Sequence, residues 1–508
     1  MPEVDASFLA MPARGLAAAA LERAQALGAE HADFRLERTR VARLQLRDGA
    51  LDSSTDSEDV GLAVRVVHDG AWGFASGIIR SAEAAAELAE QAVATAKVSR
   101  VLSRDPVVLA PEQVYADVTW VSSYDVNPFD VSPVERAERL ADLSDRLLAA
   151  DGVDHVDAAM IQVLENKFYA DTAGTMTTQQ RVRIEPHFTA VHVDRGAGAF
   201  YSMRTLAPPA GRGWEYLTGT GWDFDAEIAE LPELLREHAK APSVEAGRYD
   251  LVIDPSNLWL TIHESIGHAT ELDRALGYEA AYAGTSFATL DRLGSLKYGS
   301  PAMFVTGDRV VEHGLATIGY DDEGVAGQEF DIVRDGVLVG YQLNRQMAQA
   351  NADSLGELGG RSNGCAFADS AGHIPLQRMA NVSLQPAPDG PSTEDLISGV
   401  ERGIYIKGDR SWSIDMQRFN FQFTGQQFHR IENGRLVGQL RDVAYQATTT
   451  DFWGAMEAVG GPETYVLGGA FNCGKGQPGQ VAAVSHGCPA ALFRGINVLN
   501  TKAEGGRG

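Results

Sequence analysis

The chain has 508 residues, of which 44% are apolar and 22% charged, a composition typical of globular proteins rather than disordered or fibrous ones. At roughly 150 residues per domain, this length predicts three domains or two large ones. The 43 basic residues (Lys and Arg) face 69 acidic ones, so the formal net charge is −26 and no basic surface for nucleic acid is expected.

The cysteine content and the N-terminal segment indicate the cellular compartment in which the protein is expected. Three cysteines do not predict a disulfide framework, and a reducing environment fits them best. The N-terminal segment carries acidic residues where a signal peptide requires basic ones, and no run reaches the ~18 apolar residues that span a bilayer. We therefore expect a soluble, cytoplasmic protein without a membrane segment.

The first 110 residues alternate helix and strand patterns. A helix is expected over residues 14–27, and an alternating, half-buried strand from residue 31. Asp48-Gly49 and Asp69-Gly70 are hairpin signals, and a second helix is expected from Ser81. This order predicts helices packed on an antiparallel sheet.

The same order recurs further along the chain. A helix is expected over 134–150, followed by residues 152–157, which resemble residues 28–33, and by further alternating stretches. We therefore expect an N-terminal α+β domain over 1–240, built from two related helix-plus-sheet units, 1–110 and 111–240. Residues 236–247, polar and containing Pro242, are the predicted linker.

The C-terminal half, residues 241–508, is rich in strand patterns and glycine. A strand is expected over 249–254, and Asp335-Gly336 and Asn433-Gly434 are further hairpin signals. Phe452 and Trp453 are expected in the core. The fold class predicted for the whole chain is α+β, with a strand-rich second half over residues 241–508.

A metal-binding pattern lies on the helix expected after Asp254, where Pro255 ends the strand and Ser256 can cap the helix. The segment reads His263-Glu264-Ser265-Ile266-Gly267-His268. Zinc requires imidazoles that converge on one point, and a neighbouring carboxylate can accept a proton from water on the metal. Zinc helices usually place the two histidines four residues apart; here they are five apart.

This spacing demands a local irregularity. Five residues of a regular α-helix turn by about 500°, so the two side chains would diverge by roughly 140°. A single π-turn of ~4.4 residues per turn brings them to roughly 50° apart, and Gly267 lowers the steric cost of the distortion. A metal site therefore predicts a π-bulge here. The alternative is a regular helix that carries two unrelated histidines.

Several residues are candidates for the third ligand: Cys473, His486, Glu271 and Glu279. Cys473 lies in a tight glycine-rich loop, where Lys475 is expected to favour its thiolate. Cys365 and Cys488 are interpreted as small buried apolar residues. Chemistry alone leaves Cys473, His486 and Glu271 open.

The motif His263-Glu264-x-x-x-His268, followed far downstream by Cys473-Gly474-Lys475-x-Gln477-Pro478, resembles the TldD/PmbA family, also called modulator of DNA gyrase. The similarity runs over essentially the whole chain. Further segments that carry it are 321–324, Gly327-Gln328, 375–381 and 431–434. Only the TldD-like subunits of this family carry the metal motif, so the chain is similar to the catalytic partner.

The resemblance implies a zinc metallopeptidase that acts on small or unfolded polypeptides, as the catalytic subunit of a heterodimer with a TldE/PmbA-like partner. It implies that His263, His268 and Cys473 bind zinc and that Glu264 is the base. The natural substrate does not transfer, and a homodimer is also open. We expect an extended peptide to add to an exposed sheet edge, and the charge of −26 disfavours strongly acidic substrates.

Two other functions remain open. The dipeptidyl-peptidase III family also uses His-Glu-x-x-Gly-His, with a downstream Glu as third ligand; Cys473→Ser would then leave metal content intact. A non-catalytic peptide-binding subunit with a structural zinc is the second, in which case the wild type would cleave nothing. The acidic run Asp321-Asp322-Glu323 is interpreted as a solvated turn, because it lacks the ligand spacing of a cation site.

Overall fold

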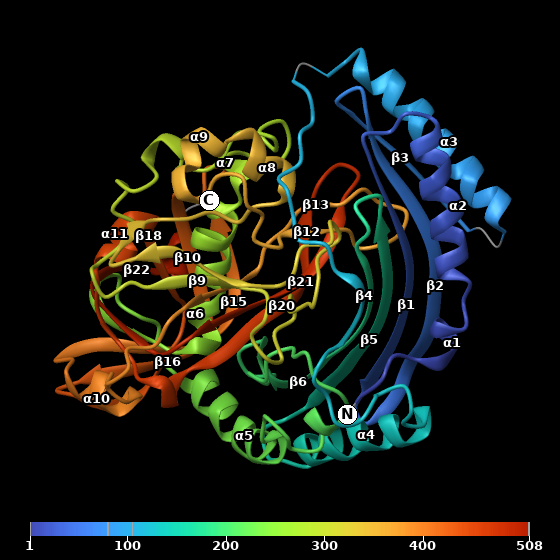
Figure 1. Cartoon of the computed structure of the whole chain (residues 1–508). Helices are drawn as coiled ribbons and strands as arrows, with labels where there is room; N and C mark the ends of the chain where they lie inside the picture. Colours follow the sequence, from blue (N-terminus) through green and yellow to red (C-terminus); the bar gives the residue numbers. More distant parts are fainter. Residues whose placement is uncertain (1, 79–80, 104, 506–508) are drawn as a thin grey trace.

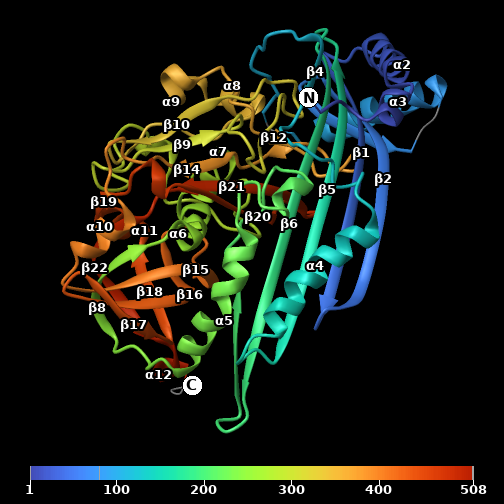
Figure 2. The same ribbon diagram turned by 90° about the horizontal axis from the view of Figure 1, so that it is seen from below.

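The computed structural model describes residues 2–78, 81–103 and 105–505. Helices make up 25% and strands 39% of the chain, and the two are mixed, so the predicted α+β class is confirmed. A long, curved sheet from the N-terminal part stands beside a strand-rich C-terminal part in both views (Figures 1 and 2). Among the described helices, none combines the length and the apolarity that crossing a bilayer requires.

Seven strands form the long sheet, in the order β3-β2-β1-β5-β6-β4, with β7 paired to β6. Their bounds are β1 His31–Arg47, β2 Ala50–His68, β3 Ala71–Gly77, β4 Ala116–Val121, β5 His155–Asp171, β6 Met176–Asp194 and β7 Ala199–Arg204. The two segments with the same helix-and-strand order join through the antiparallel pair β1–β5, so one continuous sheet results. Asp48 and Asp69 adopt positive φ before glycine, which confirms both hairpin turns.

Helices cover the outer face of this sheet (Figure 1). Their bounds are α1 Ala6–Leu9, α2 Ala13–Ala26, α3 Ala82–Arg100, α4 Pro133–Leu148 and α5 Phe224–Lys240, with a 3₁₀ turn at Trp214–Tyr216. The alanine-rich faces of α2 and α3 pack on Phe34 and Leu36 of β1. Because α5 extends to Lys240, the first part of the predicted linker 236–247 is helical, and the linker prediction is wrong there.

A closed barrel of five strands organises the C-terminal part. It consists of β15 (Arg402–Ile414), β8 (Gly247–Ile253), β22 (Ala491–Asn500), β18 (Val443–Thr448) and β16 (Asn420–Glu432), and a β15–β16 pairing closes the ring. Strands β17 (Arg435–Leu440) and β19 (Met456–Val459) extend it. Phe452 and Trp453 are fully buried beside it, as predicted. Closure leaves the ring itself without a free edge.

Smaller elements surround the barrel. A four-stranded sheet has the order β11 (Val337–Leu338), β10 (Glu329–Arg334), β9 (Val305–Asp308) and β14 (Asn381–Leu384). Two further pairs are β12 (Ala366–Phe367) with β13 (Leu376–Gln377), and β20 (Val466–Lys475) with β21 (Gln480–Cys488). The helices are α6 Pro255–Ile262, α7 Leu272–Ala275, α8 Arg345–Ala350, α9 Ala352–Leu355, α10 Thr393–Ser398, α11 Thr449–Gly454 and α12 Thr501–Gly505. Short 3₁₀ turns lie at Leu290–Arg292, Gly356–Leu358 and Pro462–Thr464. Positive φ at Asp335 and Asn433 confirms the hairpin signals of this half.

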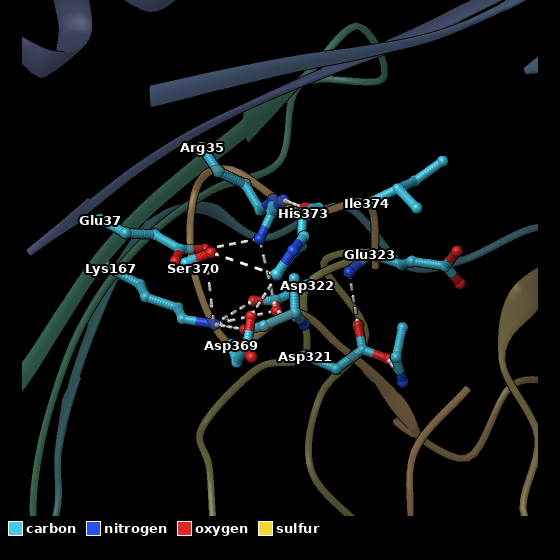
Figure 3. Close-up of polar contacts among 12 residues, drawn as sticks. Arg35, Glu37, Lys167, Asp321, Asp322, Glu323, Asp369, Ser370, His373 and Ile374 are labelled. Carbon is cyan, nitrogen blue, oxygen red and sulfur yellow. Dashed lines mark hydrogen bonds and ion pairs between the residues drawn. The ribbon is translucent and has the colours of Figure 1, made fainter. Parts of the chain in front are cut away.

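The inner face of the long sheet carries charge rather than apolar side chains. Residues 32–38 of β1 are buried on both faces, not half-buried as predicted, because the C-terminal part covers the inner face. Lys167 of β5 donates to both oxygens of Asp322, at 2.9 and 3.1 Å, and lies 3.5 Å from Glu37 (Figure 3). Arg35 lies 2.5 Å from Glu37 and 3.6 Å from Asp322. We call these four residues the interface cluster.

A second set of buried ion pairs continues the interface. Arg65 of β2 pairs with Asp33 at 2.8 Å and with Glu323 at 3.0 Å. The segment Asp321-Asp322-Glu323 is 3%, 4% and 2% exposed, so the prediction of a solvated turn is wrong. Its carboxylates are instead held by backbone N–H groups and by cations from the sheet. The charges therefore join the two parts of the chain.

Candidate metal centre

The histidine motif lies at the end of α6. The helix begins at Pro255 and is capped by Asp254, whose carboxylate accepts from Ser256 N. Asp254, not Ser256 as predicted, is therefore the capping residue. The backbone then widens into a π-turn over His263–Gly267 and tightens into a 3₁₀ turn over His268–Thr270. The predicted π-bulge is thus present.

The π-turn brings the two imidazoles together. The ring centroids of His263 and His268 lie 4.7 Å apart, with the planes inclined by 78°. Gly267 has an ordinary helical φ of −51°, so the π-turn does not need the wider backbone freedom that glycine offers. A Cβ there would lie 2.6 Å from Sδ of the buried Met379, and glycine is needed for this close approach.

Cys473 completes the group, on strand β20 rather than in the predicted glycine-rich loop. Its Sγ lies 3.6 Å from His268 Nε2, and one ligand atom each from His263, His268 and Cys473 lies within 4.8 Å of the others. A tetrahedral zinc with Zn–S of about 2.3 Å and Zn–N of about 2.05 Å places sulfur and nitrogen about 3.6 Å apart. The donor set and its spacing therefore fit a zinc ion with three protein ligands.

Hydrogen bonds orient both histidines. His486 Nδ1 donates to the carbonyl of Val382 at 2.8 Å, so the neutral His486 ring can accept at Nε2 from His263 Nδ1, 2.7 Å away. His268 Nδ1 donates to Glu271 Oε2 at 2.9 Å. Both histidines consequently keep the lone pair on Nε2 for a metal, as outer hydrogen bonds do at zinc sites.

The other candidates for the third ligand are not part of the group formed by His263, His268 and Cys473. Glu271 accepts from His268 and, at 3.1 Å, from Lys475. Glu279 pairs with Arg274 at 3.0 Å, and His486 faces His263. Among the described residues, only the set with Cys473 has the spacing of a metal site.

Electrostatics favour a thiolate at Cys473. Burial raises the pKa of this thiol, but His268, His263 and Arg378 hold it well below its usual range. Burial lowers the pKa of His268, yet the Cys473 sulfur and Glu271 raise it to about 9. Lys475 does not serve Cys473 as predicted, because its ammonium lies 2.8 Å from Asp273 and also contacts Glu271.

The other two cysteines are inert by comparison. Cys365 and Cys488 are fully buried, as predicted. Burial raises the pKa of Cys365 to about 12 and that of Cys488 well above its usual range, so neither forms a thiolate at neutral pH.

The motif opens onto a cleft of about 590 Å³, walled on one side by His263, Glu264, His268 and Cys473. The long sheet forms another wall, with residues 185–187 of β6 and 204–209 at and after the end of β7. Burial raises the pKa of Glu264, but His263, His268 and Arg418 hold it below its usual value, so this carboxylate is ionised at neutral pH.

The sequence did not predict the roles that two residues have at this site. His486, named above as a candidate third ligand, instead orients His263 through a hydrogen bond. Arg418, which pairs with Glu264, is not among the residues that the sequence predicts for the site. No spacing rule links residues 154 positions apart, so the sequence carries no signal for this pair.

Known proteins resemble the chain over most of its length. It matches the family profiles described as PmbA/TldA metallopeptidase C-terminal domain, over residues 246–500, and PmbA/TldA metallopeptidase domain 1, over residues 32–96. A metalloprotease of Methanocaldococcus jannaschii is 26% identical over 85% of this chain and 89% of its own length. The metalloprotease TldD homologue of Haemophilus influenzae is 23% identical over 93% of each chain.

Solved structures share the fold. A Thermotoga maritima protein described as a proposed modulator of a DNA gyrase superposes with a TM-score of 0.74 at 16% identity, covering 96% of this chain and 100% of its own. TldE from Thermococcus kodakarensis superposes with a TM-score of 0.70 at 14% identity, covering 94% and 98%. Site and relatives together define a metallopeptidase. The chain belongs to the PmbA/TldD family, as its motifs predicted.

Proposed function

We propose that this chain is a zinc-dependent peptidase in which His263, His268 and Cys473 hold the ion and Glu264 is the catalytic base. The observation that carries the proposal is the convergence of the three ligand atoms within 4.8 Å, beside a carboxylate that lines the cleft. A relative in Saccharolobus solfataricus, 25% identical over 54% of this chain and 57% of its own, is named a zinc metalloprotease TldD homologue, which supports zinc.

The chemistry divides between the ion and the protein. Bound zinc supplies a Lewis acid for the scissile carbonyl and a nucleophile at neutral pH. Glu264 accepts a proton from the attacking water on its carboxylate and passes it to the leaving amine. His486 and Glu271 hold the two imidazoles in place, and Arg378, which donates to the Cys473 carbonyl at 2.6 Å, supports the third ligand.

We propose small or unfolded polypeptides as substrates, bound in extended form. Strand β20 pairs with β21 alone in the described part of the chain, and its residues 468–470 line the cleft. A peptide can add to this edge through main-chain hydrogen bonds, which demand little of its sequence. A peptide with N-methylated amides should bind at least tenfold more weakly than its unmodified twin; equal affinity would reject this binding mode.

A TldE-like subunit is the proposed partner. The fold matches that of TldE, which supports a pair of similar subunits of which this one carries the metal motif. Co-expression of this chain with a PmbA/TldE-like protein, followed by size-exclusion chromatography, tests the heterodimer. If this chain instead eluted without the co-expressed protein, at the size of two copies, a homodimer would be favoured.

Metal analysis and peptide cleavage test the function itself. We expect one zinc per chain in the wild type and in Glu264→Gln, little in Cys473→Ser, and cleavage only by the wild type. Full metal in Cys473→Ser would support a carboxylate as third ligand. Cleavage that resists chelators but not thiol alkylation would make Cys473 a nucleophile and refute the proposal.

A further inference from the structure

Arg418 contacts the carboxylate of Glu264, the proposed base. Its guanidinium forms an ion pair with Oε2 of Glu264, and the side chains are 15% and 7% exposed. Glu264 is among the residues that line the cleft, whereas Arg418, as far as the described residues show, is not. One carboxylate oxygen of Glu264 is therefore paired with a side chain that is not among the described residues of the cleft wall.

The loop that carries Arg418 fixes the backbone of this residue. Arg418 has φ of +64°, a left-handed conformation that favours glycine or asparagine, at the tip between β15 and β16. Its N–H donates to the Asp415 carbonyl at 3.0 Å, and its carbonyl accepts from Thr449 Oγ1 at 2.8 Å. The Asp415 carboxylate accepts from Phe419 N at 2.8 Å and Asn420 N at 3.0 Å.

The loop is also fixed to its neighbours. Thr285 N donates to the carbonyl of Met416 at 2.9 Å, and Phe287 N to that of Gln417 at 3.0 Å. The rings of Phe287 and Phe419 lie 5.3 Å apart. An arginine is thus kept in a conformation that glycine would adopt more easily, on a rigid support beside the base. Unfavourable backbone conformations of this kind concentrate at functional sites.

We propose that Arg418 is a positioning residue for the reaction: by holding one oxygen of Glu264, it directs the other toward the cleft. This inference rests on the proposed function, in which Glu264 is the base. A purely structural ion pair is the weaker interpretation, because buried pairs contribute little net stability and glycine would relieve the backbone.

The variant Arg418→Gly tests the role directly, since it removes the guanidinium and suits the backbone. We expect kcat for a peptide substrate to fall about 10- to 100-fold, as for other outer residues of metal sites, with KM and zinc content unchanged. Arg418→Lys should recover part of the loss. Asp335→Gly is the matched control, because Asp335 also has positive φ, at 50°, on an exposed turn outside the cleft.

A double variant separates this role from general damage. In a Glu264→Gln background, which is expected to bind zinc but not to cleave, Arg418→Gly should leave both the zinc content and the urea unfolding curve unchanged if Arg418 acts only through Glu264. A kcat for Arg418→Gly within twofold of wild type, a gain in activity, or a fall that follows zinc content would overturn the inference. Activity retained by Glu264→Gln would instead refute the proposed function.

Discussion

His486 is not a proposed zinc ligand but is hydrogen-bonded to one, so its removal should weaken zinc binding without removing a ligand. It is not among the described residues that line the cleft, yet its Nε2 lies 2.7 Å from Nδ1 of His263. In His486→Ala the buried Nδ1–H of His263 loses its acceptor, which costs about 1–3 kcal/mol. Loss of an outer hydrogen bond at metal sites lowers affinity 10- to 100-fold, or about 1.4–2.8 kcal/mol. The two estimates agree, so we expect zinc affinity to fall by one to two orders of magnitude.

The assay is competition for zinc between the metal-free protein and a chromophoric chelator at fixed pH. His486→Gln keeps an acceptor for His263 and should recover most of the affinity. Ser485→Ala is the control, because Ser485 points elsewhere and accepts from Leu315 N at 3.0 Å. A His486→Ala protein with wild-type circular dichroism and zinc affinity within twofold of wild type would refute the reasoning.

Other predictions concern charge. Because the pKa of His268 is raised to about 9 in the metal-free protein, its imidazolium must lose a proton before zinc binds. The apparent zinc affinity should therefore rise about tenfold per pH unit between about pH 7.5 and 9 and level off above; a flat profile in the same competition assay would contradict this. Lys167→Met should destabilise the fold by about 3–5 kcal/mol in urea unfolding, since the buried Asp322 loses its nearer cation and keeps only Arg35 at 3.6 Å, and adding Asp322→Asn should restore much of this stability. If Asp322→Asn did not raise the stability of the Lys167→Met protein, the Lys167–Asp322 ion pair would not be the cause of the loss. Glu185 lines the cleft wall and burial raises its pKa, so its ionised carboxylate should favour cationic substrates increasingly as the pH rises. Glu185→Gln should lower kcat/KM for a lysine-containing peptide more than for its glutamine analogue, and equal losses would count against a role in specificity.

Much of the centre was predictable because its chemistry is local. Two histidines five residues apart can share an ion only if the helix widens, and a π-turn is found there. The choice of Cys473 came from family resemblance, and spacing alone had left Glu271 and His486 open. The ligand and base roles themselves stay predictions until metal and activity are measured.

Tertiary context decided the rest. β1 alternates like a half-exposed strand, but its charged face is covered by a second layer whose acids neutralise it. The run Asp321-Asp322-Glu323 looks like a solvated turn for the same reason: its counterions lie more than a hundred residues away. The boundary near residue 240 and the two related units in 1–240 stay predictions.

The interface cluster also limits how the enzyme meets its substrates. The sheet that holds Lys167 and Arg35 also supplies one wall of the cleft, while the part that holds Asp322 supplies another. Prising these walls apart would strand several ions without partners in a medium that solvates them poorly. We therefore expect the two walls of the cleft to keep a fixed separation. If the proposed function holds, we expect such a cleft to admit an extended segment of polypeptide more readily than a folded domain.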